Sequence, residues 1–139
     1  MHRLIIEVTE TVLVDDPIAT RNMQALRTLG AQISIDDFGT GFTSIGQLPR
    51  LPVDTLKIDR SFVASTDPAH QELVRLIVSA AHAFGLSVVA EGIEYQEQAD
   101  SLRNVDVECG QGFLFARPQP ATALFGLQAP ADGARLPTR

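Results

Sequence analysis

The sequence predicts an α/β protein with parallel strands and flanking helices, forming part of a TIM-like (β/α) barrel. Short apolar, β-branched runs alternate with amphipathic helical runs along most of the 139 residues, which is typical of parallel sheets covered by helices. The first four apolar runs end in charged residues, at Glu7, Asp36, Lys57 and Glu91. The carboxyl ends of barrel strands share one rim, where active sites are built, so we expect these side chains to converge.

Four strands and one further candidate are predicted in chain order. The four strands cover residues 4–8, 31–35, 53–58 and 86–90, and residues 113–115 are the last candidate. Each run is short and bounded by Gly, Pro or Asp, as expected for strands.

Capping residues and prolines predict where the helices begin. Asp16 and Pro17 open a helix that runs to about Leu29, and Asp67 and Pro68 open a second helix that ends before Gly85. Shorter helices are predicted at residues 44–48 and 95–104. The inward faces are expected to carry Ile18, Met23, Leu26 and Leu29 in the first helix, and Leu73, Leu76, Ile77, Ala80, Ala81 and Phe84 in the second.

Composition excludes several classes of protein. With 45% hydrophobic and 20% charged residues the chain reads as soluble and globular. A net charge of −6 disfavours a nucleic-acid polymer as partner, and no apolar run is long enough for a signal peptide or membrane span. Cys109 is the single cysteine, so an internal disulfide is excluded; we expect a buried structural thiol and a cytoplasmic location.

The histidines and the tail carry little chemistry in this interpretation. His70 and His82 lie in the second long helix without metal-binding spacing, so we expect exposure or packing. The Pro- and Gly-rich residues 128–139 are expected to be disordered, which leaves residues 1–127 as one domain.

The acidic strand ends predict a metal site. Clustered carboxylates repel one another and persist only with protons or cations between them, and oxygen ligands favour Mg²⁺ or Mn²⁺ over zinc. The adjacent Asp36 and Asp37 suit such ions, while Lys57 would neutralise charge on a phosphate. Metal-assisted phosphodiester hydrolysis fits these parts best. Two alternatives stay open: single strand-end acids, such as Glu7 and Asp59, that serve as caps or salt-bridge partners, and Lys57 as a Schiff-base lysine.

Five motifs, in order, resemble the EAL family of cyclic-di-GMP phosphodiesterases. Residues 7–10 are similar to its Glu-Leu-Thr-Glu element, and residues 36–42 to its Asp-Asp-Phe-Gly-Thr-Gly-Tyr loop, with Phe42 in place of tyrosine. The remaining motifs are residues 51–63, 88–94 and 111–118. The resemblance implies the C-terminal half of an EAL-type barrel that hydrolyses cyclic-di-GMP to linear pGpG with Mg²⁺ or Mn²⁺.

The resemblance also implies roles for individual residues. Metal ligation is expected from Glu7, Asp36 and Asp37, and catalysis from Lys57 and from Glu91 as general base. Gln111 would contact the substrate or a metal-bound water. Glu10 and Glu94 would hold the loop at residues 36–42.

The family's Glu-Ala-Leu segment and a later asparagine ligand have no counterpart in this sequence. A closed eight-stranded barrel takes about 250 residues, so we expect the chain to self-associate or to belong to a larger polypeptide. The alternative function is an inactive EAL fragment that binds nucleotide or another protein.

Overall fold

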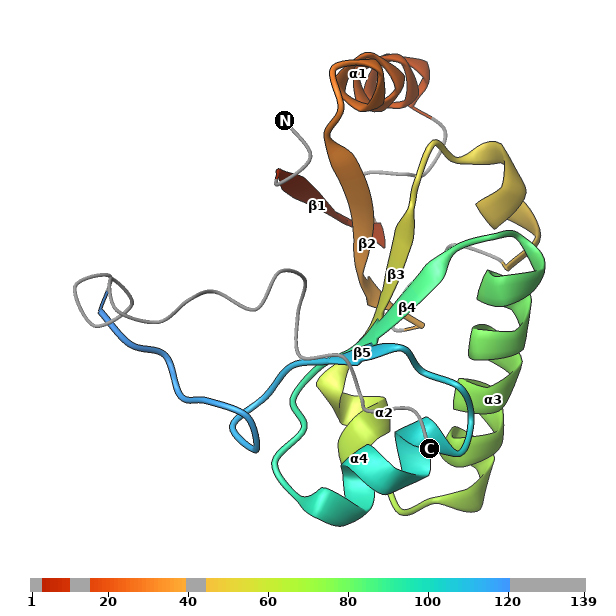
Figure 1. The fold of residues 1–139 in the computed structure, drawn as a ribbon. Helices are drawn as coiled ribbons and strands as arrows, with labels where there is room; N and C mark the ends of the chain where they lie inside the picture. Colours follow the sequence, from red (N-terminus) through yellow and green to blue (C-terminus); the bar gives the residue numbers. More distant parts are fainter. Residues whose placement is uncertain (1–3, 11–15, 40–44, 121–139) are drawn as a thin grey trace.

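The computed structural model describes residues 4–10, 16–39 and 45–120, and within them five strands form one parallel sheet (Figure 1). The strands lie side by side in chain order, and each neighbouring pair is parallel. They are β1 (Ile5–Thr9), β2 (Gln32–Phe38), β3 (Thr55–Ile58), β4 (Ser87–Ala90) and β5 (Cys109–Gly110). The predicted α/β class with parallel strands is confirmed.

Residues 113–115 do not form the expected last strand. The fifth strand lies earlier, at Cys109–Gly110, and residues 112–115 turn away from it. A Cβ at Gly112 would lie 2.1 Å from the carbonyl oxygen of Ile93, so the chain passes directly over that backbone. This close approach, which the apolar Phe-Leu-Phe run does not reveal, diverts the chain out of the sheet.

The long helices begin where the sequence predicts. These are α1 (Pro17–Thr28), α3 (Pro68–Ala83) and α4 (Gln96–Arg103). Asp16 Oδ1 accepts a 2.8 Å hydrogen bond from the Ile18 N–H, and Asp67 Oδ1 accepts one of 2.9 Å from the Ala69 N–H. Each carboxylate satisfies a backbone donor that has no partner inside its helix.

Two shorter helical segments complete the described part of the chain. The 3₁₀ helix η2 (Ile45–Arg50) lies close to the predicted turn. The helix α2 (Arg60–Ala64) was not predicted, because five residues are too few to show a helical period.

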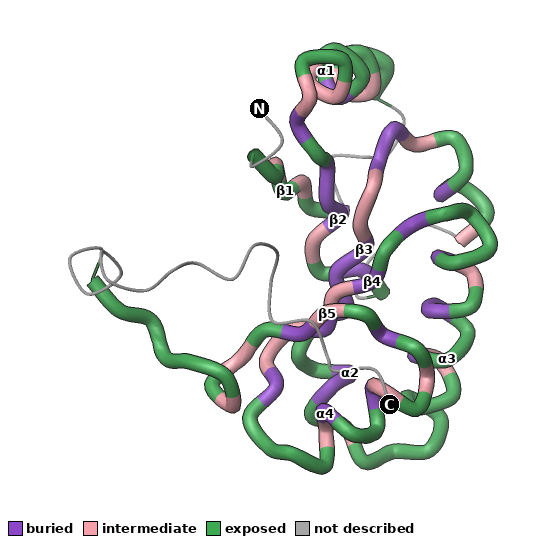
Figure 2. The backbone as a smooth tube through the Cα atoms, in the orientation of Figure 1, coloured by how far each residue is buried: buried purple, intermediate pink, exposed green. Residues whose placement is uncertain are grey.

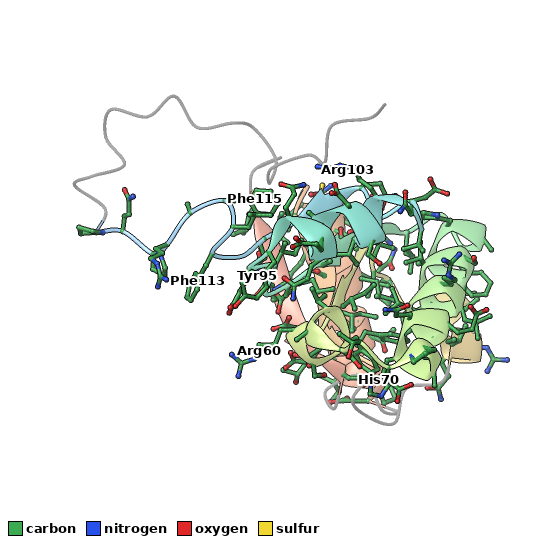
Figure 3. All side chains as sticks on the ribbon, turned by 90° about the horizontal axis from the view of Figure 1, so that it is seen from below. Arg60, His70, Tyr95, Arg103, Phe113 and Phe115 are labelled. Atoms are coloured by element: carbon green, nitrogen blue, oxygen red, sulfur yellow. The ribbon has the colours of Figure 1, made fainter. Side chains whose placement is uncertain are left out.

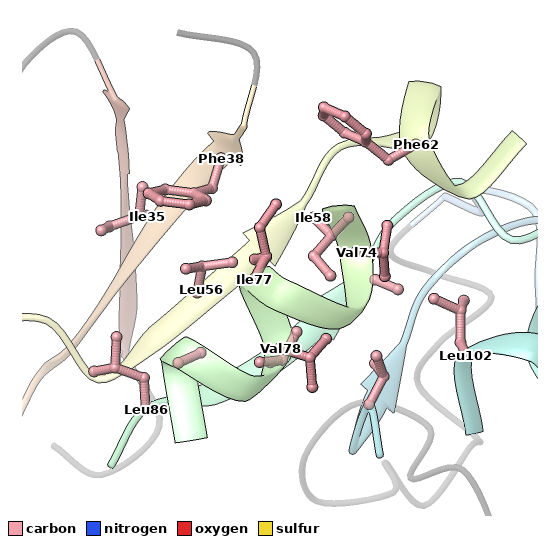
Figure 4. Packing of buried hydrophobic residues seen from close by; sticks show 14 of the residues in the cluster. Ile35, Phe38, Leu56, Ile58, Phe62, Val74, Ile77, Val78, Leu86 and Leu102 are labelled. Carbon is pink, nitrogen blue, oxygen red and sulfur yellow. The ribbon is translucent and has the colours of Figure 1, made fainter. Parts of the chain in front are cut away.

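The hydrophobic core lies between the sheet and its helices. Right-handed crossovers between consecutive parallel strands place the connecting helices on the same face, and Figure 1 shows α3 and α4 on one side of the sheet. Buried positions gather in the central strands and on the sheet-facing side of α3 (Figure 2). The core shown in Figure 4 includes Ile35, Phe38, Leu56, Ile58, Phe62, Val74, Ile77, Val78, Leu86 and Leu102.

The expected inward faces of the two long helices are partly wrong. In α3 and its C-cap, Leu76 and Phe84 are 56% and 41% exposed, and the buried residues are instead Val74, Ile77, Val78 and Ala81. In α1 and its C-cap, Met23 is buried, whereas Ile18 and Leu29 are exposed. Both helices carry more apolar residues than one face holds, so contact with the sheet decided which of them are buried.

Three residues that were assigned no chemistry have structural contacts. The ring of His70 packs edge-on against Phe62 with centroids 5.5 Å apart, and His82 Nε2 lies 2.9 Å from Glu108 Oε1. Cys109 lies in β5 and is partly exposed, which corrects the expected buried thiol.

No helix among the described residues is long and apolar enough to cross a membrane. The predicted disordered tail lies outside the described residues.

Candidate functional site

The two faces of the sheet have opposite chemical character. Side chains alternate between the faces of a strand, and the apolar set of Ile33, Ile35, Leu56 and Val88 is buried in the helix-covered core. A polar row of register partners lies on the opposite face: Glu7, Ser34, Thr55 and Ser87. The candidate site is built at the carboxyl end of this polar face.

A bulge in β2 places two consecutive aspartates at the site. Ile35 pairs with Leu56 and Phe38 with Ile58, so three steps along β2 match two along β3. Asp37 adopts a left-handed backbone with φ 56°. Adjacent residues of a regular strand point to opposite faces, and a bulge interrupts that alternation.

The bulge brings three carboxylates together. One carboxylate oxygen from each of Asp36, Asp37 and Glu91 lies within 4.8 Å of the other two. These residues come from the ends of two strands that are separated by β3. The predicted convergence of strand-end acids is therefore present in the fold.

Lys57 is the cation at the centre of this group. Its Nζ lies 2.7 Å from Glu7 Oε1 and 3.1 Å from Asp36 Oδ1, and it also contacts Glu91 Oε1. The Lys57 side chain is only 7% exposed. Burial acts to lower the pKa of Lys57, but the close contacts with the carboxylates of Glu7, Glu91 and Asp36 outweigh it and hold that pKa above its usual value. An environment that favours the charged ammonium argues against the Schiff-base alternative, which needs a neutral amine.

Gln111 links β5 to the same group. Its Nε2 donates a 2.7 Å hydrogen bond to Glu91 Oε1. Its backbone N–H donates to the carbonyl of Ala90 at 2.9 Å and extends the pairing of β4 with β5. The main-chain pairing thus sets the position from which Gln111 reaches Glu91.

Asp59 is a strand-end acid for which the sequence favoured a role as cap or salt-bridge partner, and the structure confirms the cap. It caps α2, where its Oδ1 accepts a 2.9 Å hydrogen bond from the Ser61 N–H. Burial acts to raise the pKa of Asp59, but hydrogen bonds from Ser61, Arg60 and Asp37 outweigh it and lower that pKa. The pKa of Asp37 is raised by desolvation and by the charges of Asp36 and Asp59. The opposite pKa shifts couple the carboxyl groups of Asp37 and Asp59, and in the sequence only the strand-end position of Asp59 hinted at this pairing.

Glu10 and Glu94 follow β1 and β4 in the chain. Glu10 directly follows β1 and is buried, with 4% of its surface exposed. Glu94 is exposed, and its backbone N–H donates to Gln98 Oε1 at 2.8 Å. Residues 40–42 of the loop that these two residues are expected to hold lie outside the described residues.

The donor set fits a hard divalent cation. All three clustered groups are carboxylates, whose oxygens are the donors that Mg²⁺ and Mn²⁺ prefer. Asp36 Oδ1 is buried and accepts no hydrogen bond of ordinary geometry from a described residue, although Lys57 Nζ lies 3.1 Å away. An incompletely satisfied buried carboxylate oxygen favours a bound cation.

A cavity of about 410 Å³ lies elsewhere, between α2, α3 and α4. Its apolar floor includes Phe62, Val74 and Leu102, and none of the clustered carboxylates lines it. We therefore assign the chemistry to the strand ends and not to this cavity.

The fold and the site define a parallel α/β protein with an acidic, lysine-bearing rim suited to a divalent cation. The profile of the EAL domain matches residues 1–118, and the chain belongs to the EAL domain family. The resemblance inferred from the five motifs is thereby confirmed.

Named relatives agree with this assignment. The chain is 44% identical over 121 residues to the cyclic di-GMP phosphodiesterase PdeR of Escherichia coli. It matches the structure of the PaMucR phosphodiesterase in complex with c-di-GMP at 41% identity and a TM-score of 0.81. It also matches a manganese and cyclic-di-GMP complex of Klebsiella pneumoniae BlrP1 at 37% identity and a TM-score of 0.75.

The matches cover most of this chain but only part of each relative. They include 85% of this chain and 18% of PdeR, 87% of this chain and 50% of the PaMucR chain, and 82% of this chain and 30% of the BlrP1 chain. The predicted fold, part of an EAL-type barrel, is confirmed by these overlaps.

Proposed function

We propose that residues 1–127 are the C-terminal portion of an EAL domain and contribute to a metal-dependent cyclic-di-GMP phosphodiesterase. The observation that carries this proposal is the approach of Asp36, Asp37 and Glu91 to within 4.8 Å around the ammonium of Lys57. The reaction is the hydrolysis of one phosphodiester bond of cyclic-di-GMP, which yields linear pGpG.

The acidic residues hold the cation in this proposal. Glu7, Asp36 and Asp37 bind Mg²⁺ or Mn²⁺, which supplies Lewis-acid stabilisation of the phosphoryl oxygens. Glu7 is linked to the cluster through Lys57, 2.7 Å away. The manganese complex of BlrP1 supports this type of cofactor.

The other residues position the reacting groups. The Lys57 ammonium stabilises negative charge that develops on the phosphate, and Glu91 removes a proton from the attacking water. Gln111 holds Glu91 Oε1 through its 2.7 Å hydrogen bond and contacts the substrate. Glu10 and Glu94 hold the loop that follows Asp37.

Exposed apolar residues near both edges of the sheet indicate where another polypeptide segment would bind. Leu4 and Ile5 at the β1 edge and Phe113 and Phe115 after β5 are 40–54% exposed. Edges with unpaired strands and apolar surface favour association. We propose that a second copy or the remainder of a larger polypeptide covers them, in the cytoplasm.

Hydrolysis by the purified chain tests this function. Chromatography would follow the conversion of cyclic-di-GMP to pGpG with Mg²⁺ or Mn²⁺, and with a chelator in place of the metal. Asp36→Asn is expected to abolish turnover. Asp67→Asn is the matched control, because Asp67 caps α3 through Ala69 and asparagine caps equally well.

The second candidate is a non-catalytic module that binds nucleotide or protein. It is favoured by the match to only half of the PaMucR chain. Metal-dependent binding of cyclic-di-GMP without turnover at high protein concentration would select this candidate over the enzyme.

A further inference from the structure

Arg60 lies between the ends of β3 and β4, beside the carboxylate cluster. It is the first residue of α2 and directly follows Asp59, whose carboxyl group is coupled to that of Asp37. On its other side it touches the loop after β4, where a Cβ at Gly92 would lie 2.4 Å from Arg60 Cβ and 3.4 Å from its Cα. Gly92 in turn directly follows Glu91. The base of the Arg60 side chain is therefore held next to the site by two neighbouring segments.

The guanidinium group of Arg60 extends from this anchor into solvent. The residue is exposed, and none of the ion pairs formed within residues 4–10, 16–39 and 45–120 includes it. Figure 3 shows Arg60 projecting from α2 on the side away from α3, with Tyr95 on the same side. An exposed arginine is ordinary by itself, but this one leaves the acidic rim on the side that α3 does not cover.

The cation inside the site is already engaged by acidic side chains. Lys57 Nζ contacts Glu7, Asp36 and Glu91, so a single positive charge faces three carboxylates. Cyclic-di-GMP carries two phosphodiester groups, each with one negative charge. A divalent cation at the carboxylate cluster would balance the phosphate that reacts. The other phosphate then lies beside an acidic rim, where it is repelled unless a further positive charge pairs with it.

We propose that Arg60 binds the phosphodiester group of cyclic-di-GMP that is not cleaved. A guanidinium presents parallel N–H donors that pair with two oxygens of one phosphate. After Lys57, Arg60 is the next cationic side chain along the sequence, and it is the one anchored between β3 and β4. This inference rests on the proposed function and assigns Arg60 to substrate binding and not to bond cleavage. Its loss should therefore raise KM and leave kcat nearly unchanged.

Substitution of Arg60 in the purified chain separates binding from turnover. Arg60→Gln removes the charge but keeps a polar side chain, and we expect KM for cyclic-di-GMP to rise about tenfold while kcat changes by less than about twofold. Arg60→Lys keeps the charge without the planar fork and should restore part of the affinity. Arg75→Gln is the matched control, because Arg75 is exposed on α3 and forms only a 3.8 Å pair with Glu72.

Linear GpG, which has one phosphodiester group and no terminal phosphate, tests which phosphate Arg60 contacts. Binding of GpG and of cyclic-di-GMP would be titrated with Ca²⁺, an ion that also binds carboxylate oxygens. The single phosphate of GpG should occupy the carboxylate cluster. Arg60→Gln should then weaken cyclic-di-GMP binding about tenfold and leave GpG binding unchanged. Equal weakening of both ligands would overturn the inference.

The two proposals fail separately in these experiments. Hydrolysis by the wild type with the same KM in Arg60→Gln and Arg75→Gln would refute the role of Arg60 alone. Arg60-dependent binding of cyclic-di-GMP without any hydrolysis by the wild type would refute the enzyme alone. The absence of cyclic-di-GMP binding by the wild type would overturn both.

Discussion

Lys57 Nζ and Glu7 Oε1 lie 2.7 Å apart, so β1 and β3 are connected across the intervening β2 at the carboxyl end of the sheet. The same ammonium contacts Asp36 and Glu91, which belong to β2 and the end of β4. One side chain thus joins acidic residues from three neighbouring segments. The negative charge of each of these carboxylates is therefore balanced by Lys57 or by a bound cation.

Replacing Lys57 with methionine should destabilise the metal-free protein by about 3 kcal/mol, because it leaves partly buried carboxylates uncompensated. Urea unfolding would measure the free energy of unfolding with and without Mg²⁺. Added Mg²⁺ should restore more stability to Lys57→Met than to the wild type, since the ion takes over the neutralising role. Equal gains in stability on adding Mg²⁺ to the two proteins would contradict a cation site beside Lys57.

Asp37→Asn should have the opposite effect on the metal-free protein. Because the pKa of Asp37 is raised by desolvation, Asp36 and Asp59, the folded state favours its protonated form. Its ionisation therefore lowers stability as the pH rises through that pKa. We expect the variant to be more stable than the wild type at neutral pH and equal to it in acid, as measured by urea unfolding in a chelator. Glu72→Gln, at an exposed position on α3, is the control. A larger gain in the stability of Asp37→Asn in acid than at neutral pH would contradict this prediction.

Asp54 anchors α1 to the sheet and should matter for stability alone. Its carboxylate accepts from Arg27 Nη2 at 2.7 Å and from the Ile33 N–H at 2.9 Å, in a partly buried position. Asp54→Ala leaves both donors without this partner, and we expect a loss of about 1–3 kcal/mol in the free energy of unfolding. Asp100→Ala, which breaks the more exposed pair with Arg103, should cost less than about 1 kcal/mol. Similar losses in the two variants would contradict the importance of the Ile33 contact.

Gly112→Ala should distort the turn that carries Phe113. The added Cβ would lie 2.1 Å from the Ile93 oxygen and 2.3 Å from its nitrogen, so backbone must move. We expect a loss of more than about 2 kcal/mol in urea unfolding, within the range of overpacked cores. Gly85→Ala controls for backbone strain, since φ is +74° there and no atom lies within 4 Å of the added carbon. Its expected cost is about 1–2 kcal/mol. A smaller loss for Gly112→Ala than for Gly85→Ala would show that the turn yields easily.

Sequence reasoning succeeded where the signal was local. Asp16 with Pro17 and Asp67 with Pro68 predicted both long helix starts, because a cap and a proline act on adjacent backbone. It failed where two segments compete for one space. Residues 113–115 have strand composition, yet the contact of Gly112 with Ile93 turns them out of the sheet.

The sequence by itself determined the parallel α/β class, the family and the acids and lysine at the strand ends, because periodicity, caps and motif order are written along the chain. Only the tertiary structure decided how those residues meet. The bulge at Asp36 and Asp37 brings two consecutive carboxylates to one cluster, which a regular strand would separate. The pairing of β1, β3 and β4 with their neighbours brings Glu7 and Glu91 to Lys57. These are contacts between residues far apart in the chain, and they depend on sheet register and packing.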